Sequence, residues 1–218
     1  MLKNNPKILL YWGYKIINLF KQNTLNDGER YDPNIMNTFN INDLDQIERY
    51  NFSKNLIIKN ENVLDIACGT GYGTLLLSEK CSQITGVDIS KKSIEYANKH
   101  YKKSEKINFI QSDIFKFNGY ADFVISFETI EHINEEIEKT VFKLLSLTKR
   151  KLICSVPYME LDGHNKHHVH FNINENTFDF LGNEYQKEIL YQSSDGKIYK
   201  EKKDNTLSLI IIINKKII

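Results

Sequence analysis

The feature that most constrains this chain is a glycine loop placed directly after a short apolar run. Residues 63–67 read VLDIA, and the loop CGTGYG follows at 68–73. The run predicts a buried strand, and the residues after the loop, at 74–80, predict a helix. Glycines between a strand and a helix let the backbone approach a ligand and direct amide groups at it. The loop therefore predicts an α/β fold with a ligand site at the end of this strand.

Apolar runs alternate with amphipathic stretches after this loop, as expected for a sheet whose strands are joined by crossover helices. Ser90 is placed to cap one of these helices, and apolar residues at Ile94, Ala97 and Tyr101 give that helix a buried stripe. Apolar residues also recur at every fourth position from Ile133 to Leu145, which predicts a long helix. Further strands are predicted at 84–89, 107–113, 121–127 and 151–157.

The C-terminal part of the chain predicts a different connection. A helix is expected near 174–182, and two further apolar runs follow at 184–192 and 206–213. The segment between these runs is polar, contains Gly196 and has no helical stripe. Such a connection favours an antiparallel hairpin, which would complete an otherwise parallel sheet.

Residues 1–60 lie outside the alternating pattern. They are expected to form an N-terminal helical cap segment, with helices near 7–22 and 42–58, on a single domain that spans 61–218. The apolar stretch at 8–20 is too short to span a bilayer and no cleavage pattern follows it, so we expect neither a membrane span nor a signal peptide. The three cysteines form no CxxC pair, which favours reduced thiols and a cytoplasmic location.

Acidic residues mark the ends of three successive predicted strands. Asp88 closes the second strand, 19 residues after Gly69, where an acid can accept from the two hydroxyls of a ribose. Asp65 lies inside the first strand, where a buried carboxylate requires a partner; a ligand with an ammonium group suits it better than a pyrophosphate. Asp113 ends the third strand and could accept from an adenine amino group. These carboxylates converge on one crevice in an open α/β sheet.

Four segments resemble the successive motifs of class I S-adenosylmethionine-dependent methyltransferases: VLDIACGTGYGT, GVDIS, QSDIF and ADFVISFETIEHI. The resemblance implies a Rossmann-like, seven-stranded and mostly parallel sheet with a C-terminal antiparallel hairpin and helices on both faces. It also implies S-adenosylmethionine as cofactor and S-adenosylhomocysteine as product. Asp65, Gly69 and Gly71 would contact the methionine part, Asp88 the ribose and Asp113 the adenine. Further cofactor-binding residues implied in this way are Ala67, Ile89, Ile114 and Phe127.

Three other segments, ERYDP (29–33), IERYNF (47–52) and HHVHFN (167–172), resemble a subgroup often found in bacterial polysaccharide and glycan gene clusters. This resemblance implies O-methylation of a small-molecule or glycan-type acceptor, such as a capsule precursor. In that subgroup an arginine usually stands where this chain has His170. The acceptor pocket implied comprises Tyr31, Glu128, Glu131 and His170.

Methyl transfer from a sulfonium is an in-line displacement, so alignment of acceptor and methyl is the main contribution, worth ~7–11 kcal/mol. A hydroxyl acceptor also profits from a base, and His132, which follows the fourth predicted strand, is the first candidate. His168 is expected to contact the acceptor. The alternation His168-x-His170 could chelate a divalent metal. A polar loop is the preferred interpretation, however, and no metal is expected.

Other classes of protein are less consistent with the sequence. An NAD-dependent oxidoreductase would carry GxGxxG, whereas this loop reads GTGYG. A nucleic-acid amino-methyltransferase usually has [DNS]PP[YFW] after the fourth strand, where this chain has SFET, and the net charge of +1 provides no basic field. We therefore expect no nucleic-acid partner. A non-catalytic protein that only binds the cofactor stays open, and the oligomeric state is not indicated.

Overall fold

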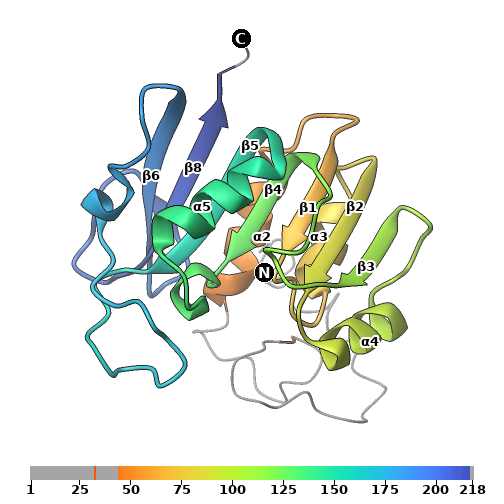
Figure 1. The fold of residues 1–218 in the computed structure, drawn as a ribbon, viewed down its shortest axis with the longest axis horizontal. Helices are drawn as coiled ribbons and strands as arrows, with labels where there is room; N and C mark the ends of the chain where they lie inside the picture. Colours follow the sequence, from red (N-terminus) through yellow and green to blue (C-terminus); the bar gives the residue numbers. More distant parts are fainter. Residues whose placement is uncertain (1–31, 33–43, 217–218) are drawn as a thin grey trace, which may run out of the picture.

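The computed structural model describes residue 32 and residues 44–216, and these form a twisted sheet flanked by helices (Figure 1). The helix expected at 7–22 and the predicted pocket residue Tyr31 lie outside the described residues. The strands are β1 (Asn62–Ile66), β2 (Gln83–Asp88), β3 (Ile107–Gln111), β4 (Ala121–Phe127), β5 (Thr148–Pro157), β6 (Tyr185–Ser193), β7 (Ile198–Tyr199) and β8 (Thr206–Lys215). The helices are α2 (Leu44–Lys54), α3 (Tyr72–Ser78), α4 (Lys91–His100) and α5 (Ile137–Ser146), with short 3-10 helices η2 (Ile130–His132) and η3 (Glu175–Phe178).

The sheet has the order β3-β2-β1-β4-β5-β8-β6-β7. Strands β1 to β5 pair in parallel, while β8 is antiparallel to both β5 and β6. The Rossmann-like fold and the C-terminal hairpin are therefore confirmed. Alternation of strands and crossover helices along the chain places all carboxyl ends of β1 to β4 at one edge, where such sheets bind ligands.

The expected count of seven strands is wrong by one, because residues 44–216 alone contain eight. The additional strand is β7, which pairs Ile198 and Tyr199 with the end of β6. After β6 the chain turns at Gly196, whose φ of 79° suits a tight reversal, and Ile198 then packs against the apolar core. This half-buried isoleucine holds two residues of the polar connection in the sheet.

Side chains of the strands alternate between two apolar layers, one on each face of the sheet. Val63 belongs to the layer that also contains Leu77 of α3, and its neighbour Leu64 belongs to the layer that contains Leu144 of α5. Helix α5 crosses one face of the sheet in Figure 1. Helix α2 joins the opposite layer through Ile47, so the chain before residue 61 contributes to the same core.

Two predicted helices differ in extent from those observed. Helix α5 begins at Ile137 and not at Ile133, because the one-turn helix η2 and a tight turn precede it. The helix expected near 174–182 is only the short 3-10 helix η3. It begins after a capping box between Asn174 and Thr177, and its last residue is the buried Phe178. Across residue 32 and residues 44–216, no helix is both long enough and apolar enough to cross a bilayer.

Candidate functional site

A cavity of about 670 Å³ opens at the carboxyl ends of β1, β2 and β4. This volume lies in the usual range for sites that bind cofactors and small molecules. Nine of the residues expected from the sequence line the cavity: Ala67, Gly69, Asp88, Ile89, Asp113, Ile114, Phe127, Glu128 and His132. Gly71, Asp65, Glu131, His168 and His170 are not among the lining residues. Helix α2 adds three lining residues that the sequence did not indicate, namely Gln46, Arg49 and Tyr50.

The glycines of the loop have different roles. Gly69 has a φ of 55°, and no atom lies within 4 Å of where its Cβ would be, so the backbone here faces open space. At Gly71, with a φ of 90°, a Cβ would lie 2.7 Å from Cβ of Ala97. Gly71 thus permits close packing of the loop on α4, whereas Gly69 leaves room for a ligand. Ala67 also has a positive φ, of 60°, and such strain is common at binding sites.

Asp88 anchors the glycine loop from the end of β2. Its Oδ2 accepts from the backbone N–H of Gly69 at 2.9 Å, and its Oδ1 accepts from the backbone N–H of Ser90 at 2.8 Å. The side chain is 5% exposed and lines the cavity. Because a carboxylate oxygen can accept more than one hydrogen bond, a side chain that anchors the loop can also contact a ligand in the cavity.

Asp65, inside β1, is fully buried and does not line the cavity. It accepts hydrogen bonds from the hydroxyls of Thr74 at 2.6 Å and Tyr50 at 3.3 Å. Burial raises the pKa of Asp65 to about 7; the two hydroxyl groups oppose this shift, and the nearby Asp88 adds to it. The chain itself therefore provides the partners that a carboxylate inside β1 requires.

The opposite wall, after β2 and β3, is more apolar. Ile89 is 65% exposed, Ile114 lines the cavity beside it, and such exposed apolar side chains suit a flat aromatic ligand. Asp113 also lines the cavity, and its Oδ1 accepts from the backbone N–H of Phe115 at 2.7 Å. Phe127 meets the ring of Tyr50 edge to face, with 5.1 Å between centroids.

An ion pair between two lining residues of the cavity joins α2 to the residue that follows β4. The guanidinium of the buried Arg49 lies 2.5 Å from Oε1 of Glu128, and Ser155 bonds to both side chains, at 3.0 and 2.7 Å. Burial acts to lower the pKa of Arg49, but Glu128 and Asp45 more than offset it, so this pKa is raised. Arg49 lies in the segment IERYNF, yet a lone arginine in a helix carries no spacing signal that identifies a partner.

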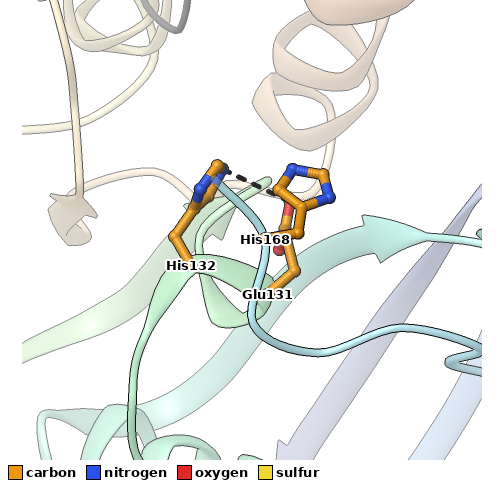
Figure 2. Close-up of side chains that lie close together, drawn as sticks. All are labelled: Glu131, His132 and His168. Atoms are coloured by element: carbon orange, nitrogen blue, oxygen red, sulfur yellow. Dashed lines mark ion pairs between the residues drawn. The ribbon is translucent and has the colours of Figure 1, made fainter. Parts of the chain in front are cut away.

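Glu131, His132 and His168 lie next to one another (Figure 2). One potential ligand atom from each residue falls within 4.8 Å of the others, and His132 Nε2 is 4.0 Å from Glu131 Oε1. The two imidazole rings meet edge to face at 4.5 Å. Burial, followed by the charge of Glu128, raises the pKa of Glu131 well above its usual value. The set of a carboxylate and two imidazoles could hold a metal ion.

His170 lies apart from this group. Its Nε2 is 3.0 Å from the carbonyl of Ile133 and 2.8 Å from that of Glu135. Because carbonyls only accept, this nitrogen carries a hydrogen and connects the loop after β5 to the chain before α5. His168 and His170 therefore do not form the chelating pair that their alternation would allow. His168 lies with Glu131 and His132 instead. The alternation of residues alone could not reveal that arrangement.

The chain matches a family model described as "Methyltransferase domain" over residues 57–206. It therefore belongs to this family of methyltransferase domains. The match begins just before β1 and ends at the start of β8, so it contains every wall of the cavity except α2.

Two curated relatives match part of this chain. An uncharacterized RNA methyltransferase of Mycoplasma mobile is 35% identical over 113 residues, which is 49% of this chain and 31% of the relative. A ubiquinone biosynthesis O-methyltransferase of Pelagibacter ubique is 33% identical over 81 residues, 36% of this chain and 34% of the relative. The matches thus span about a third of these relatives.

A solved structure shows the same fold over almost the whole chain. It is the magnesium protoporphyrin IX methyltransferase of Synechocystis PCC 6803 with bound S-adenosylhomocysteine. The TM-score is 0.64 at 16% identity, and the alignment covers 97% of this chain and 100% of that one.

Proposed function

We propose that this protein is an S-adenosylmethionine-dependent methyltransferase that acts on an oxygen atom of a small-molecule or glycan-type acceptor and releases S-adenosylhomocysteine. One observation carries the proposal. The carboxylate of Asp88 lines a cavity and holds the open glycine Gly69 at its rim, at the end of β2. Membership of the methyltransferase family favours this cofactor over NAD.

The residues around the cavity fit the parts of such a cofactor. Asp88 would accept from the ribose hydroxyls, and Asp113 from the adenine amino group, with Ile89 and Ile114 against the ring. When bound, S-adenosylmethionine supplies a methyl group already activated by the positive charge on sulfur. The chain must then exclude water and align the acceptor. We infer that α2 contributes to this by placing Gln46, Arg49 and Tyr50 over the cavity.

Two observations support an oxygen acceptor. The Pelagibacter relative is named as an O-methyltransferase, and the carboxylate of Glu128 and the imidazole of His132 both line the cavity. His132 Nδ1 faces the carbonyl of His167 at 3.2 Å, so its Nε2 is the nitrogen able to take a proton. A base at His132 and a glycan acceptor stay predictions from the sequence.

Titration with S-adenosylhomocysteine tests the cofactor site. We expect saturable binding to the wild type, weakened roughly tenfold or more in Asp88→Ala, because the variant loses both the ligand contact and the anchor of Gly69. Asp122→Ala is the matched control, since this carboxylate accepts from the backbone N–H of Asn62 at the other end of the sheet. Equal affinity in wild type and Asp88→Ala would refute the assignment of Asp88.

An RNA acceptor is the second candidate, favoured by the name of the Mycoplasma relative. The two candidates differ in their substrates. With labelled S-adenosylmethionine, transfer to RNA would identify the second, and transfer to catechols or sugar hydroxyls would support the first. Turnover of any acceptor would also separate an enzyme from a protein that only binds the cofactor.

A further inference from the structure

We propose that Glu131, His132 and His168 form a binding site for one divalent transition-metal ion at the acceptor end of the cavity. The site itself is independent of the proposed function; only the role given to the ion below rests on it. This inference departs from the expectation of a metal-free loop, because the folded chain brings together residues that are far apart in the sequence.

The surroundings of Glu131 favour a bound cation. Its side chain is 0% exposed, and neither carboxylate oxygen has a hydrogen-bond donor among the described residues. A carboxyl group buried without donors is costly to ionise, and a bound cation is one of the partners that normally compensate this cost. The guanidinium of Arg49 does not satisfy it, since that group bonds to Glu128, Asp45 and Ser155. A cation between Glu131 and the two imidazoles would supply what is missing.

The hydrogen-bond partners of the two imidazoles also suit a metal ion. His132 Nδ1 lies 3.2 Å from the carbonyl of His167, and His168 Nδ1 contacts the carboxylate of Glu160. Both partners accept hydrogen bonds, which places the hydrogen of each neutral ring on Nδ1 and the lone pair on Nε2. A metal-binding histidine shows this same pattern, with its other nitrogen donating to a carbonyl or carboxylate. The amide of Asn165 donates to His168 Nε2 at 3.0 Å and would move aside for an ion.

Hydrogen bonds to η2 hold the loop that carries His168 in place. The backbone N–H groups of Val169 and His170 donate to the carbonyl of Glu131 at 2.8 and 3.2 Å. The His170 side chain bonds in addition to two carbonyls before α5. Residues on both sides of the proposed ligands are therefore tied to one another, which holds the three ligands in place before any ion binds.

The donor set indicates the class of ion. Two imidazoles with one carboxylate suit Zn²⁺, Mn²⁺, Fe²⁺ or Co²⁺, whereas Mg²⁺ and Ca²⁺ prefer oxygen ligands alone. Three protein ligands also leave positions open for a substrate. Because His132 lines the cavity, such an ion would face the acceptor.

An ion at this place would replace a base. A divalent ion lowers the pKa of a hydroxyl that approaches it. The acceptor oxygen then attacks the methyl carbon, the carbon–sulfur bond breaks with its electron pair returning to sulfur, and the hydroxyl proton passes to solvent water. His132 Nε2 cannot both bind the ion and take this proton, so the two roles of His132 exclude one another.

A Co²⁺ titration of the full chain tests the site. The protein is first treated with a chelator, and Co²⁺ binding is then monitored by visible absorption. We expect a single Co²⁺ per wild-type chain. Glu131→Gln and His168→Asn should each weaken binding by about 100-fold, and Glu160→Gln, which only orients His168, by about 10- to 100-fold. The control is His164→Asn, an exposed histidine of the same loop, which should bind as the wild type does. S-adenosylhomocysteine affinity should stay within about twofold in all four variants, which shows that the fold is intact.

The outcomes separate the site from the function. Equal Co²⁺ affinity in wild type, Glu131→Gln and His168→Asn, or no saturable binding at all, overturns the site. Methyl transfer that continues in the presence of chelator overturns the role of the ion and leaves the proposed function standing. Specific Co²⁺ binding by a protein that does not bind S-adenosylhomocysteine would support the site and refute the proposed function.

Discussion

The guanidinium of Arg49 and the carboxylate of Glu128 lie 2.5 Å apart and join helix α2 to the end of β4. Glu128 holds a φ of 45°, which a residue with a side chain rarely adopts. Ser155, on the adjacent strand β5, donates to Glu128 Oε1 and accepts from Arg49 Nη1. The ion pair and this hydroxyl therefore fix both the cavity wall and the strained turn that leads to Glu131.

Replacing Arg49 by methionine should lower the free energy of unfolding by about 2–3 kcal/mol, because charged hydrogen bonds are lost and Asp45 and Glu128 lose the cation that they share. The measurement is urea denaturation. Lys54→Met provides the control, since the pair of Lys54 with Glu79 is largely exposed and should contribute at most about 1 kcal/mol. A loss as small for Arg49→Met as for Lys54→Met would show that the pair does not stabilise the fold.

Alanine substitutions at the two loop glycines should separate binding from folding. Gly69→Ala places a methyl in open space and should cost about 1–2 kcal/mol of stability, while S-adenosylhomocysteine affinity falls roughly tenfold. Gly71→Ala should cost about 3 kcal/mol, because its Cβ would clash with Ala97 and the ring of Phe109.

The control for the glycine pair is Gly163→Ala. Gly163 also has a positive φ, of 76°, and open surroundings, but it lies in the loop after β5 and does not line the cavity. Gly163→Ala should lower the stability by as much as Gly69→Ala does, while the affinity for S-adenosylhomocysteine stays unchanged. If Gly163→Ala weakened binding as much as Gly69→Ala, the loss at Gly69 would reflect general destabilisation and not contact with the ligand.

Adenosine binding should depend on Asp113. Asp113→Asn should weaken the binding of adenosine and of S-adenosylhomocysteine by the same factor, about fivefold, because one hydrogen bond to the adenine that both ligands share is altered. Competition titrations measure both affinities. A loss confined to S-adenosylhomocysteine would instead place Asp113 near the amino-acid part of the ligand.

The sequence predicts the cavity well where periodicity and strand ends decide it. Apolar runs correctly predicted β1 to β5 and the hairpin. Because parallel strands end at one edge of the sheet, the sequence also predicted that Asp88 and Asp113 line the same cavity. Strand β7 was missed because two residues are too few to show a period of two. It exists because Ile198 can reach the core.

Contacts between distant segments could not be predicted in the same way. Arg49 and Glu128 are 79 positions apart, and no local pattern links them. The group of Glu131, His132 and His168 depends on how the loop after β5 returns to η2, which two backbone hydrogen bonds to Glu131 decide. For Asp65 the sequence indicated a buried carboxylate that needs a partner, and the partners turned out to be the hydroxyls of Thr74 and Tyr50.

Asp65 should make the stability of the protein depend on pH. Its pKa is 3.8 in the unfolded chain and about 7 in the folded one, mainly because burial disfavours the charged form. Between these values the folded state keeps a proton that the unfolded state has lost. The free energy of unfolding should therefore fall as pH rises from about 4 to about 7, by at most ~1.4 kcal/mol per pH unit, and this contribution should be constant above that range.

Asp65→Asn removes this ionisation while it keeps the size of the side chain, so its stability should fall less than that of the wild type over the same interval. Urea denaturation at several pH values between 4.5 and 8 measures both slopes. Asp122→Asn changes a carboxylate at the amino end of the strands and should retain the wild-type slope. Parallel curves for wild type and Asp65→Asn would mean that Asp65 has the same pKa in the folded and the unfolded protein, in which case the hydrogen bonds from Thr74 and Tyr50 fully offset the effect of burial.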